Sequence, residues 1–246
     1  MDAAYGIARS LVVYHANPLK LRRARRLYRT FLSPGDLAFD IGAHVGDRVR
    51  AWRAIGAQVV AVEPQDAPRR VLELLYAGDP EVVIVPMAVG AAAGAAMLRR
   101  DPTNPTVASL DQGWIDRRRV DPRFRGTAWS QSQSVAVTTL ADLIRRFGTP
   151  AFCKIDVEGS EPDVLAGLDR PLPALSFEVL AGEREGAEAC VARLESLAAG
   201  GDPYTYLFVP GETFVPATPW LDARSLLESI PGLSATAGSG DVYARR

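Results

Sequence analysis

Short apolar segments alternate with helical patterns along most of the chain, and this alternation restricts the possible folds more than any other feature. LAFDIGA at 37–43 reads as a buried strand, residues 47–56 as a helix, and 58–64 as a second apolar strand. The later predicted elements are a helix at 66–78, strands at 81–90 and 95–100, a strand end and helix over 135–148, a strand at 151–157, a helix at 161–168, a strand at 174–180, a helix at 185–199, a strand at 204–210, a helix at 222–229 and a strand at 241–245.

This order predicts an α/β fold: a doubly wound, mostly parallel sheet with helices on both faces. The strands are apolar throughout rather than alternating, which is typical of strands buried on both faces. The elements near the C-terminus are shorter and include aromatic strands, so we expect an antiparallel pair at one edge of the sheet.

Composition excludes several classes of protein. The 246 residues are 48% hydrophobic and 23% charged, with a net charge of −1, so no nucleic-acid partner is expected from charge. Cys153 and Cys190 lie on separate predicted elements, and neither is spaced to share a zinc ion or a disulfide framework. No signal peptide or apolar run of ~18–20 residues is recognisable, which predicts a cytoplasmic protein. Oligomeric state is not indicated.

The first 33 residues are predicted to form a basic helical extension, and 34–246 to form the α/β domain. The sequence PLKLRRARRLYRTFL, which begins at Pro18, places apolar residues at helical spacing. Its basic residues are Lys20, Arg22, Arg23, Arg25, Arg26 and Arg29. Two interpretations are open: a solvated face on a helix that packs against the sheet, or a docking site for lipid headgroups, nucleic acid or a phosphate-bearing substrate.

Residues 101–133 show no sustained period and are predicted to be an inserted loop over the active face. Structureless loops of this length are uncommon in compact domains unless they are functional or mobile. Trp114, Phe124 and Trp129 are available there to touch a ligand. A poorly ordered loop is the alternative.

A glycine turn follows the first strand. In FDIGAHVGD at 39–47, Gly42 and Gly46 permit positive φ angles and close approach of a ligand to the backbone. The middle glycine that would admit a pyrophosphate is missing. Glu63, at the end of the second strand, can accept hydrogen bonds from ribose hydroxyls, and Asp40 precedes the turn. We therefore predict a nucleoside that carries a cation, and S-adenosylmethionine has this chemistry.

Several motifs together resemble the FkbM-type methyltransferases. They are DIGAHVG at 40–46, VEP at 62–64, AVG at 88–90, TTLAD at 138–142, KIDVEGSE at 154–161 and FE at 177–178. The resemblance covers about residues 35–180 and implies a seven-stranded, Rossmann-like class I fold that uses S-adenosylmethionine. It also implies O-methylation of a small-molecule or glycan acceptor, such as a sugar or a secondary metabolite. The candidate cofactor-binding residues are Asp40, Gly42, Ala43, Gly46, Glu63, Pro64, Ala88 and Asp156.

The segment AFCKIDVEGSE at 151–161 ends in three carboxylates, although its beginning reads as a buried strand. Ligands bind beyond the carboxyl ends of such strands, so Asp156 and Glu158 are predicted to face the same crevice as the glycine turn. A hydroxyl acceptor needs a base to take its proton. The candidate catalytic residues are Asp156, Glu158, Glu178 and His44.

Alternatives to this interpretation remain open on sequence alone. Asp156, Glu158 and Glu178 have the oxygen ligands that Mg²⁺ or Ca²⁺ prefers, although their spacing matches no recognised metal loop, so no metal is assigned. Lys154 is expected to be a charge partner for one of these acids. A nicotinamide-dependent oxidoreductase on a related sheet is a second possible function, and a membrane- or RNA-docking protein that uses the helix at 18–31 is a third.

Overall fold

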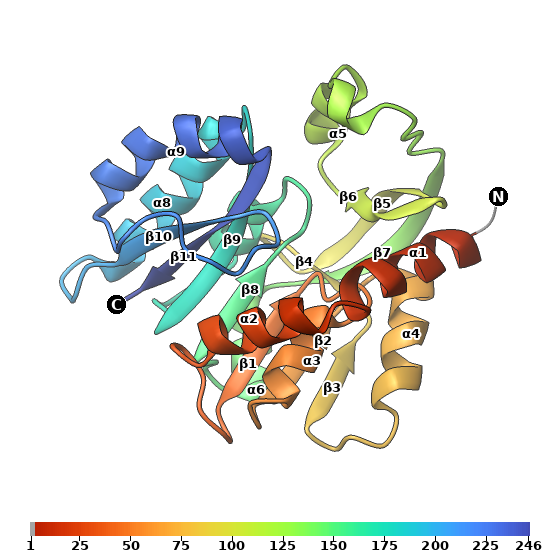
Figure 1. The fold of residues 1–246 in the computed structure, drawn as a ribbon, viewed down its shortest axis with the longest axis horizontal. Coiled ribbons are helices and arrows are strands. Elements are labelled where there is room, and N and C mark those ends of the chain that lie inside the picture. Colours follow the sequence, from red (N-terminus) through yellow and green to blue (C-terminus); the bar gives the residue numbers. More distant parts are fainter. Residues whose placement is uncertain (1–2) are drawn as a thin grey trace.

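The computed structural model describes residues 3–246, and its central feature is one seven-stranded sheet (Figure 1). The strand order is β10-β11-β9-β8-β1-β2-β3, with β11 antiparallel to both of its neighbours and all other pairs parallel. The strands of this sheet are β1 (Leu37–Ile41), β2 (Gln58–Val62), β3 (Val82–Val85), β8 (Phe152–Ile155), β9 (Ala174–Leu180), β10 (Thr205–Pro210) and β11 (Ser239–Arg245). The predicted fold class is confirmed, including the antiparallel pair at one edge.

Helices cover both faces of the sheet, as the apolar strands predict. The helices are α1 (Ala3–His15), α2 (Pro18–Tyr28), α3 (Asp47–Arg53), α4 (Asp66–Tyr76), α5 (Gln112–Arg119), the 3-10 helix η1 (Pro122–Phe124), α6 (Leu140–Phe147), α7 (Glu161–Ala166), α8 (Arg184–Ala198) and α9 (Ala223–Ala237). Buried side chains of α2, α3 and α4 pack on one face, and those of α6 to α9 pack on the other. Adjacent residues of β1 show the division, because Ala38 belongs to the first of these cores and Phe39 to the second.

A second, four-stranded sheet stands beside the first, and the sequence patterns did not indicate it as a separate sheet. Its order is β4-β7-β5-β6. The strands are β4 (Ala88–Val89), β5 (Gly94–Asp101), β6 (Asn104–Ser109) and β7 (Gln131–Thr138). The predicted single strand at 81–90 is therefore wrong. It breaks at Pro86, which has no N–H to continue a ladder, and its two halves join different sheets.

The helix α2 near the N-terminus is part of the same core as the sheet. Tyr28 on α2 is fully buried, and its ring contacts those of Trp52 and Phe152 edge-on. Asn17 caps α2 by accepting hydrogen bonds from two backbone N–H groups. The buried side of α2 thus confirms the expectation that this helix packs against the sheet.

Two further expectations concern cysteines and membrane spans. Cys153 and Cys190 are both free and buried, an environment in which a thiol behaves as a small apolar side chain. Within residues 3–246, no helix has the length and apolar character needed to cross a bilayer.

The helix expected at 222–229 is longer than predicted, since α9 continues through Pro231 to Ala237.

Candidate functional site

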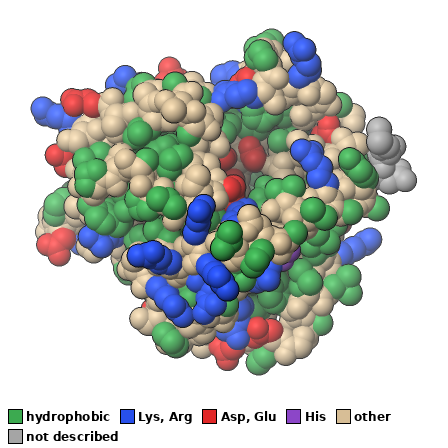
Figure 2. Space-filling view, viewed as in Figure 1, with side chains coloured by type: hydrophobic (Ala, Val, Ile, Leu, Met, Phe, Trp, Pro, Cys, Tyr) green, Lys and Arg blue, Asp and Glu red, His purple; other side chains and the backbone are tan. Residues whose placement is uncertain are grey.

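An open cavity of about 900 Å³, including its solvent-filled mouth, lies at the carboxyl ends of β1, β2 and β8. Side chains of β5 and β6 close it on one side, and residues of α1, α3 and the loop after β10 close it on the other. Nine of the eleven predicted site residues line this cavity: Asp40, Gly42, Ala43, His44, Glu63, Pro64, Ala88, Asp156 and Glu158. Figure 2 shows acidic side chains inside the hollow.

The glycine turn brings β1 and β8 together at the cavity floor. Gly42 has φ +84°, and a Cβ atom there would overlap the backbone oxygen of Asp156. The Gly42 N–H donates to the Val62 carbonyl at 2.9 Å. Gly46 was predicted to contact the cofactor, but it lies behind the turn against Leu72 and Tyr76 and does not line the cavity. Its φ of +81° instead allows the tight entry into α3.

Two buried carboxylates lie near this turn. Asp40 is 1% exposed, and its Oδ1 has no hydrogen-bond partner. Burial raises the pKa of Asp40 to about 7, against the opposing effect of Lys154. Glu63 accepts hydrogen bonds from the backbone N–H groups of His44 at 2.9 Å and Gln65 at 2.8 Å, and burial raises its pKa to about 7. Each carboxylate oxygen of Glu63 retains a second acceptor position for a ligand hydroxyl.

The acidic end of β8 gathers carboxylates from two strands. Carboxylate oxygens of Asp156, Glu158 and Glu178 all lie within 4.8 Å of one another. Burial and the neighbouring carboxylates raise the pKa values of Glu158 and Glu178 well above their usual range. Such a cluster can hold shared protons or, alternatively, a divalent cation. Glu178 approaches from β9 and does not line the main cavity.

The other charged residues of this segment have structural roles. Lys154 forms an ion pair with Asp156, as the sequence predicts. Glu161 accepts hydrogen bonds from the backbone N–H groups of Val157 at 2.9 Å and Gly159 at 3.0 Å. Glu161 therefore holds the turn that follows β8, and Glu158 adopts a left-handed φ of +55° within that turn.

His44 lines the cavity, but its electrostatics disfavour a role as base. Both ring nitrogens are buried without a hydrogen-bond partner, and burial lowers the pKa of His44 to about 4. The ring is thus neutral and weakly basic near pH 7. Its edge-on contact with Tyr14 fixes it against α1, with the ring centroids 5.9 Å apart.

The segment 101–133 is folded rather than an irregular loop, and its residues Pro105, Thr106 and Ala108 line one side of the cavity. It contains β6, α5 and η1, and its aromatic residues Trp114 and Trp129 are buried against each other and Phe124. They pack together instead of facing the cavity, because three large rings in one short segment bury more apolar surface as a cluster. The expectation that these aromatic residues contact a ligand in the cavity is therefore wrong.

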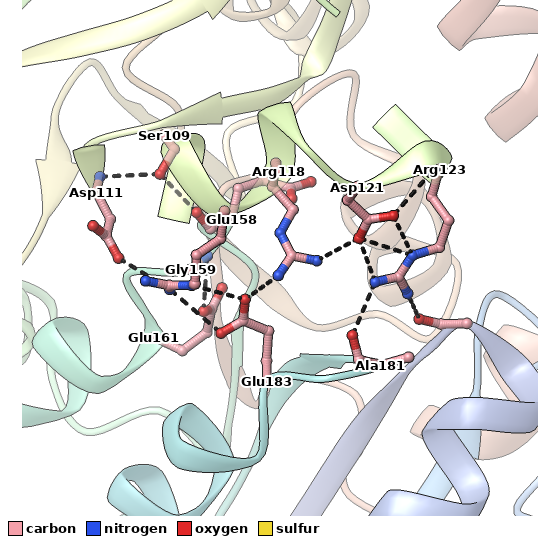
Figure 3. Close-up of polar contacts among 12 residues, drawn as sticks. Ser109, Asp111, Arg118, Asp121, Arg123, Glu158, Gly159, Glu161, Ala181 and Glu183 are labelled. Carbon is pink, nitrogen blue, oxygen red and sulfur yellow. Dashed lines mark hydrogen bonds and ion pairs between the residues drawn. The ribbon is translucent and has the colours of Figure 1, made fainter. Parts of the chain in front are cut away.

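Instead, this segment clamps the acidic turn (Figure 3). The Ser109 hydroxyl donates to the backbone oxygen of Glu158 at 2.7 Å. Arg118 on α5 forms ion pairs with Asp121 and with Glu183, which follows β9. The Trp114 ring packs so closely on Gly159 that a Cβ atom there would overlap it. The segment thus fixes the turn that carries Glu158.

A charged wall of the cavity was not predicted. Arg48 on α3 makes a two-point ion pair with Glu212, with both N–O distances 2.9 Å. Lys20 on α2 bonds the same carboxylate at 2.8 Å and lies 4.5 Å from the ring centroid of Tyr14. Although burial opposes it, Arg48 and Lys20 hold the pKa of Glu212 well below its usual range. No local motif marks this wall, since its members come from sites up to about 200 residues apart in the chain.

Lys20 was grouped by sequence with the basic outer face of its helix. Its side chain is only 13% exposed and turns toward the cavity wall, where Asp47 lies 3.6 Å away in addition to Glu212. Lys20 is therefore not available to an external anionic surface, and that part of the prediction is wrong. Lys20 turns inward because Asp47 and Glu212 lie at the cavity mouth, and a cation in a partly buried site needs an acidic partner.

The chain is similar in sequence to one protein family and in fold to several solved structures. The model of the methyltransferase FkbM domain matches residues 40–188, more than half of the chain. No curated protein sequence matches. Similar solved structures include a TehB-like SAM-dependent methyltransferase from Corynebacterium glutamicum, with a TM-score of 0.49, 9% identity, and coverage of 97% of this chain and 93% of that one. An O-methyltransferase from Bacillus cereus in complex with SAH has a TM-score of 0.45, 11% identity, and coverage of 98% and 90%.

The matched range carries the chemistry described above. It begins at Asp40, before the glycine turn, and ends at Glu188, after Glu178 and β9. The range therefore includes every predicted site residue, while α1, α2 and the Glu212 loop lie outside it. A domain of this family implies S-adenosylmethionine as the methyl donor. With these residues matched over more than half its length, the chain belongs to the FkbM methyltransferase domain family.

Proposed function

We propose that this methyltransferase transfers a methyl group from S-adenosylmethionine to a hydroxyl oxygen of a small polar molecule or glycan. The observation that carries the proposal is the two-part lining of the cavity. Apolar side chains around Ala88 suit a purine, and they include Met87, Val89, Leu98, Ala108 and Leu110. Charged and hydrogen-bonding side chains around Asp156 suit a hydroxylated acceptor.

The residues at the glycine turn have the chemistry to hold such a cofactor. When bound, S-adenosylmethionine supplies an electrophilic methyl group on a sulfonium. Asp40 presents an unpartnered, buried carboxylate oxygen that can accept from an ammonium group. Glu63 can accept from ribose hydroxyls with its remaining acceptor positions. The lining of the cavity includes six carboxylates but only two cationic side chains, Lys154 and Arg48, so it favours a cationic ligand.

We assign the role of general base to Glu158. Glu158 lines the cavity, and because burial and the neighbouring carboxylates raise its pKa, its ionised form is a stronger base than an ordinary glutamate. Asp156 lies beside it and forms an ion pair with Lys154. Glu158 can accept the proton of the acceptor hydroxyl at a carboxylate oxygen. Glu178 and Asp156 stabilise that protonated state, because an uncharged Glu158 relieves repulsion within the cluster.

The charged wall favours an acceptor with several hydroxyl groups. Tyr14, Arg48 and Glu212 line the cavity and offer donors and acceptors at its mouth. A flat aromatic acceptor would cover this wall without adding hydrogen bonds to its remaining donor and acceptor positions, which is unfavourable in a partly closed site. A sugar or similar polyol would satisfy them.

Calorimetric titration with S-adenosylhomocysteine tests the cofactor assignment. We expect binding in the micromolar range, on the order of −8 kcal/mol. Wild-type protein that melts cooperatively but shows no heat of binding would contradict it. Thermal protection by NAD without any by S-adenosylhomocysteine would restore the oxidoreductase interpretation.

Methyl transfer should then be followed with a panel of glycosides and polyols. Glu158→Gln should reduce turnover by about 100-fold or more while S-adenosylhomocysteine affinity stays unchanged. Turnover that falls in chelator and returns with Mg²⁺ would instead assign the three carboxylates to a metal ion.

A further inference from the structure

Four arginines form a single stripe on α2 and its C-terminal end. Arg22, Arg25, Arg26 and Arg29 follow the spacing i, i+3, i+4, i+7, and together they line one surface groove. The opposite side of the helix is buried through Ala24, Leu27 and Tyr28. We call the four residues the arginine stripe. It spans about 10 Å along the helix axis.

The guanidinium groups of the arginine stripe have no ion-pair or hydrogen-bond partner among residues 3–246, and the Nε atom of Arg25 is buried without one. Some exposed arginines elsewhere are paired with acids, for example Arg145 with Asp142 and Arg184 with Glu188. Like charges on one helix face repel and destabilise the helix. An external polyanion would relieve this repulsion.

Exposed apolar side chains accompany the stripe at the junction of α1 and α2. Val12 and Val13 near the end of α1 are 67% and 53% exposed, and Leu19 at the start of α2 is 58% exposed. Basic and apolar side chains side by side are typical of helices that lie in the membrane interface. A free phosphate or an RNA backbone would gain nothing from the apolar part of this surface.

The stripe lies on the same face of the molecule as the mouth of the cavity. Figure 2 shows Lys and Arg side chains gathered over α2, with hydrophobic side chains beside them, below the hollow lined by acidic groups. A surface that contacts this face of the molecule therefore lies beside the mouth of the cavity.

We propose that the arginine stripe, with Val12, Val13 and Leu19, docks the protein on an anionic phospholipid surface. Docking in this orientation presents the cavity to hydroxylated groups at that surface, such as a lipid-linked glycan. Each arginine near an anionic membrane contributes about fivefold in affinity, so the whole stripe contributes about 100-fold or more. Docking does not depend on the proposed reaction, and its test is independent of methyl transfer.

Co-sedimentation with vesicles tests the proposal. Wild-type protein should bind phosphatidylcholine vesicles that contain about 30% phosphatidylglycerol, and should not bind pure phosphatidylcholine. Binding should weaken as ionic strength rises, because salt shortens the range of exposed charge interactions. Equal binding to both kinds of vesicle, or to neither, would overturn the proposal.

Two variants of equal charge identify the surface responsible. The test variant carries Arg22→Gln, Arg25→Gln, Arg26→Gln and Arg29→Gln. The control variant carries Arg119→Gln, Arg145→Gln, Arg170→Gln and Arg184→Gln, at exposed sites on other elements. We expect the test variant to lose about 100-fold in vesicle affinity and the control to bind like wild type. Equal loss in both, or competition by short RNA without vesicle binding, would contradict the proposal.

Discussion

At the scale of single residues, Glu63 connects the cofactor proposal most directly to a measurable group. It is 2% exposed and joins the glycine turn to the loop after β2 through its bonds to the His44 and Gln65 N–H groups. Its pKa of about 7 means that protons compete with a ligand near neutral pH. A ligand hydroxyl that donates to Glu63 favours the ionised form.

Glu63→Gln should therefore weaken S-adenosylhomocysteine binding by about 10-fold or more, because it replaces a charged acceptor. In the wild type, affinity should fall as pH drops below 7, since Asp40 and Glu63 then bind protons in the free protein. Calorimetry between pH 6 and 8 measures both effects. Glu81→Gln, an exposed change just before β3, serves as control. Unchanged affinity in a folded Glu63→Gln variant would contradict a role for this carboxylate.

At the scale of elements, the position of Glu158 depends on α5 as much as on its own strand. Trp114 of α5 is fully buried and packs on Gly159, while Ser109 of β6 bonds the Glu158 carbonyl. Because Glu158 has a left-handed φ, its turn needs such external contacts to persist. The second sheet and α5 thus act together as a support for the acidic turn.

Removal of this support should affect stability and turnover together. Trp114→Ala should lower the free energy of unfolding by about 3–5 kcal/mol, and should reduce methyl transfer by more than the loss of folded protein explains. Val120→Ala, at a position 84% exposed at the end of the same helix, should change neither. Chemical denaturation and turnover at saturating cofactor measure the two effects. Full turnover by the folded fraction of Trp114→Ala would show that α5 does not position Glu158.

At the scale of the whole molecule, buried carboxyl groups make stability depend on pH. Burial raises the pKa of Glu161 to about 7, as it does for Asp40 and Glu63, and raises that of Asp241 to about 6. Between pH about 4.5 and 7 the folded state then binds more protons than the unfolded state. The free energy of unfolding must fall as pH rises through this range. The pKa of Glu212 is lowered instead, so its contribution to the free energy of unfolding is lost only as the pH falls below this range.

The ligand-free protein should accordingly be more stable at pH 5 than at pH 7.5, by about 5–7 kcal/mol, since each such group contributes about 1 kcal/mol per pH unit up to its pKa. Urea denaturation across this range measures the trend. Asp40→Asn should flatten the curve, whereas Asp163→Asn, at an exposed site on α7, should leave it unchanged. Stability that rises steadily from pH 5 to 7.5 would refute the assignment of these pKa values.

The sequence by itself determined the sheet and the part of the site that lies at strand ends. Apolar strands such as β1 and β8 indicate burial on both faces of the sheet. Parallel neighbouring strands bring their carboxyl ends to one edge, so the topology predicts that Gly42, Glu63 and Asp156 lie together. Local rules of strand, turn and helix suffice for this, because the side chains concerned lie at fixed offsets from those elements.

Only the tertiary structure decided the rest of the cavity. The bonds that join Glu212 to Arg48 and Lys20, and the packing of Trp114 on Gly159, link residues far apart in the chain, which no local pattern reports. Whether a charged side chain such as Lys20 faces solvent or a partner depends on which acid the fold brings near it. Periodicity records which faces are apolar, whereas pairing between distant polar groups is fixed by the packed arrangement of the elements.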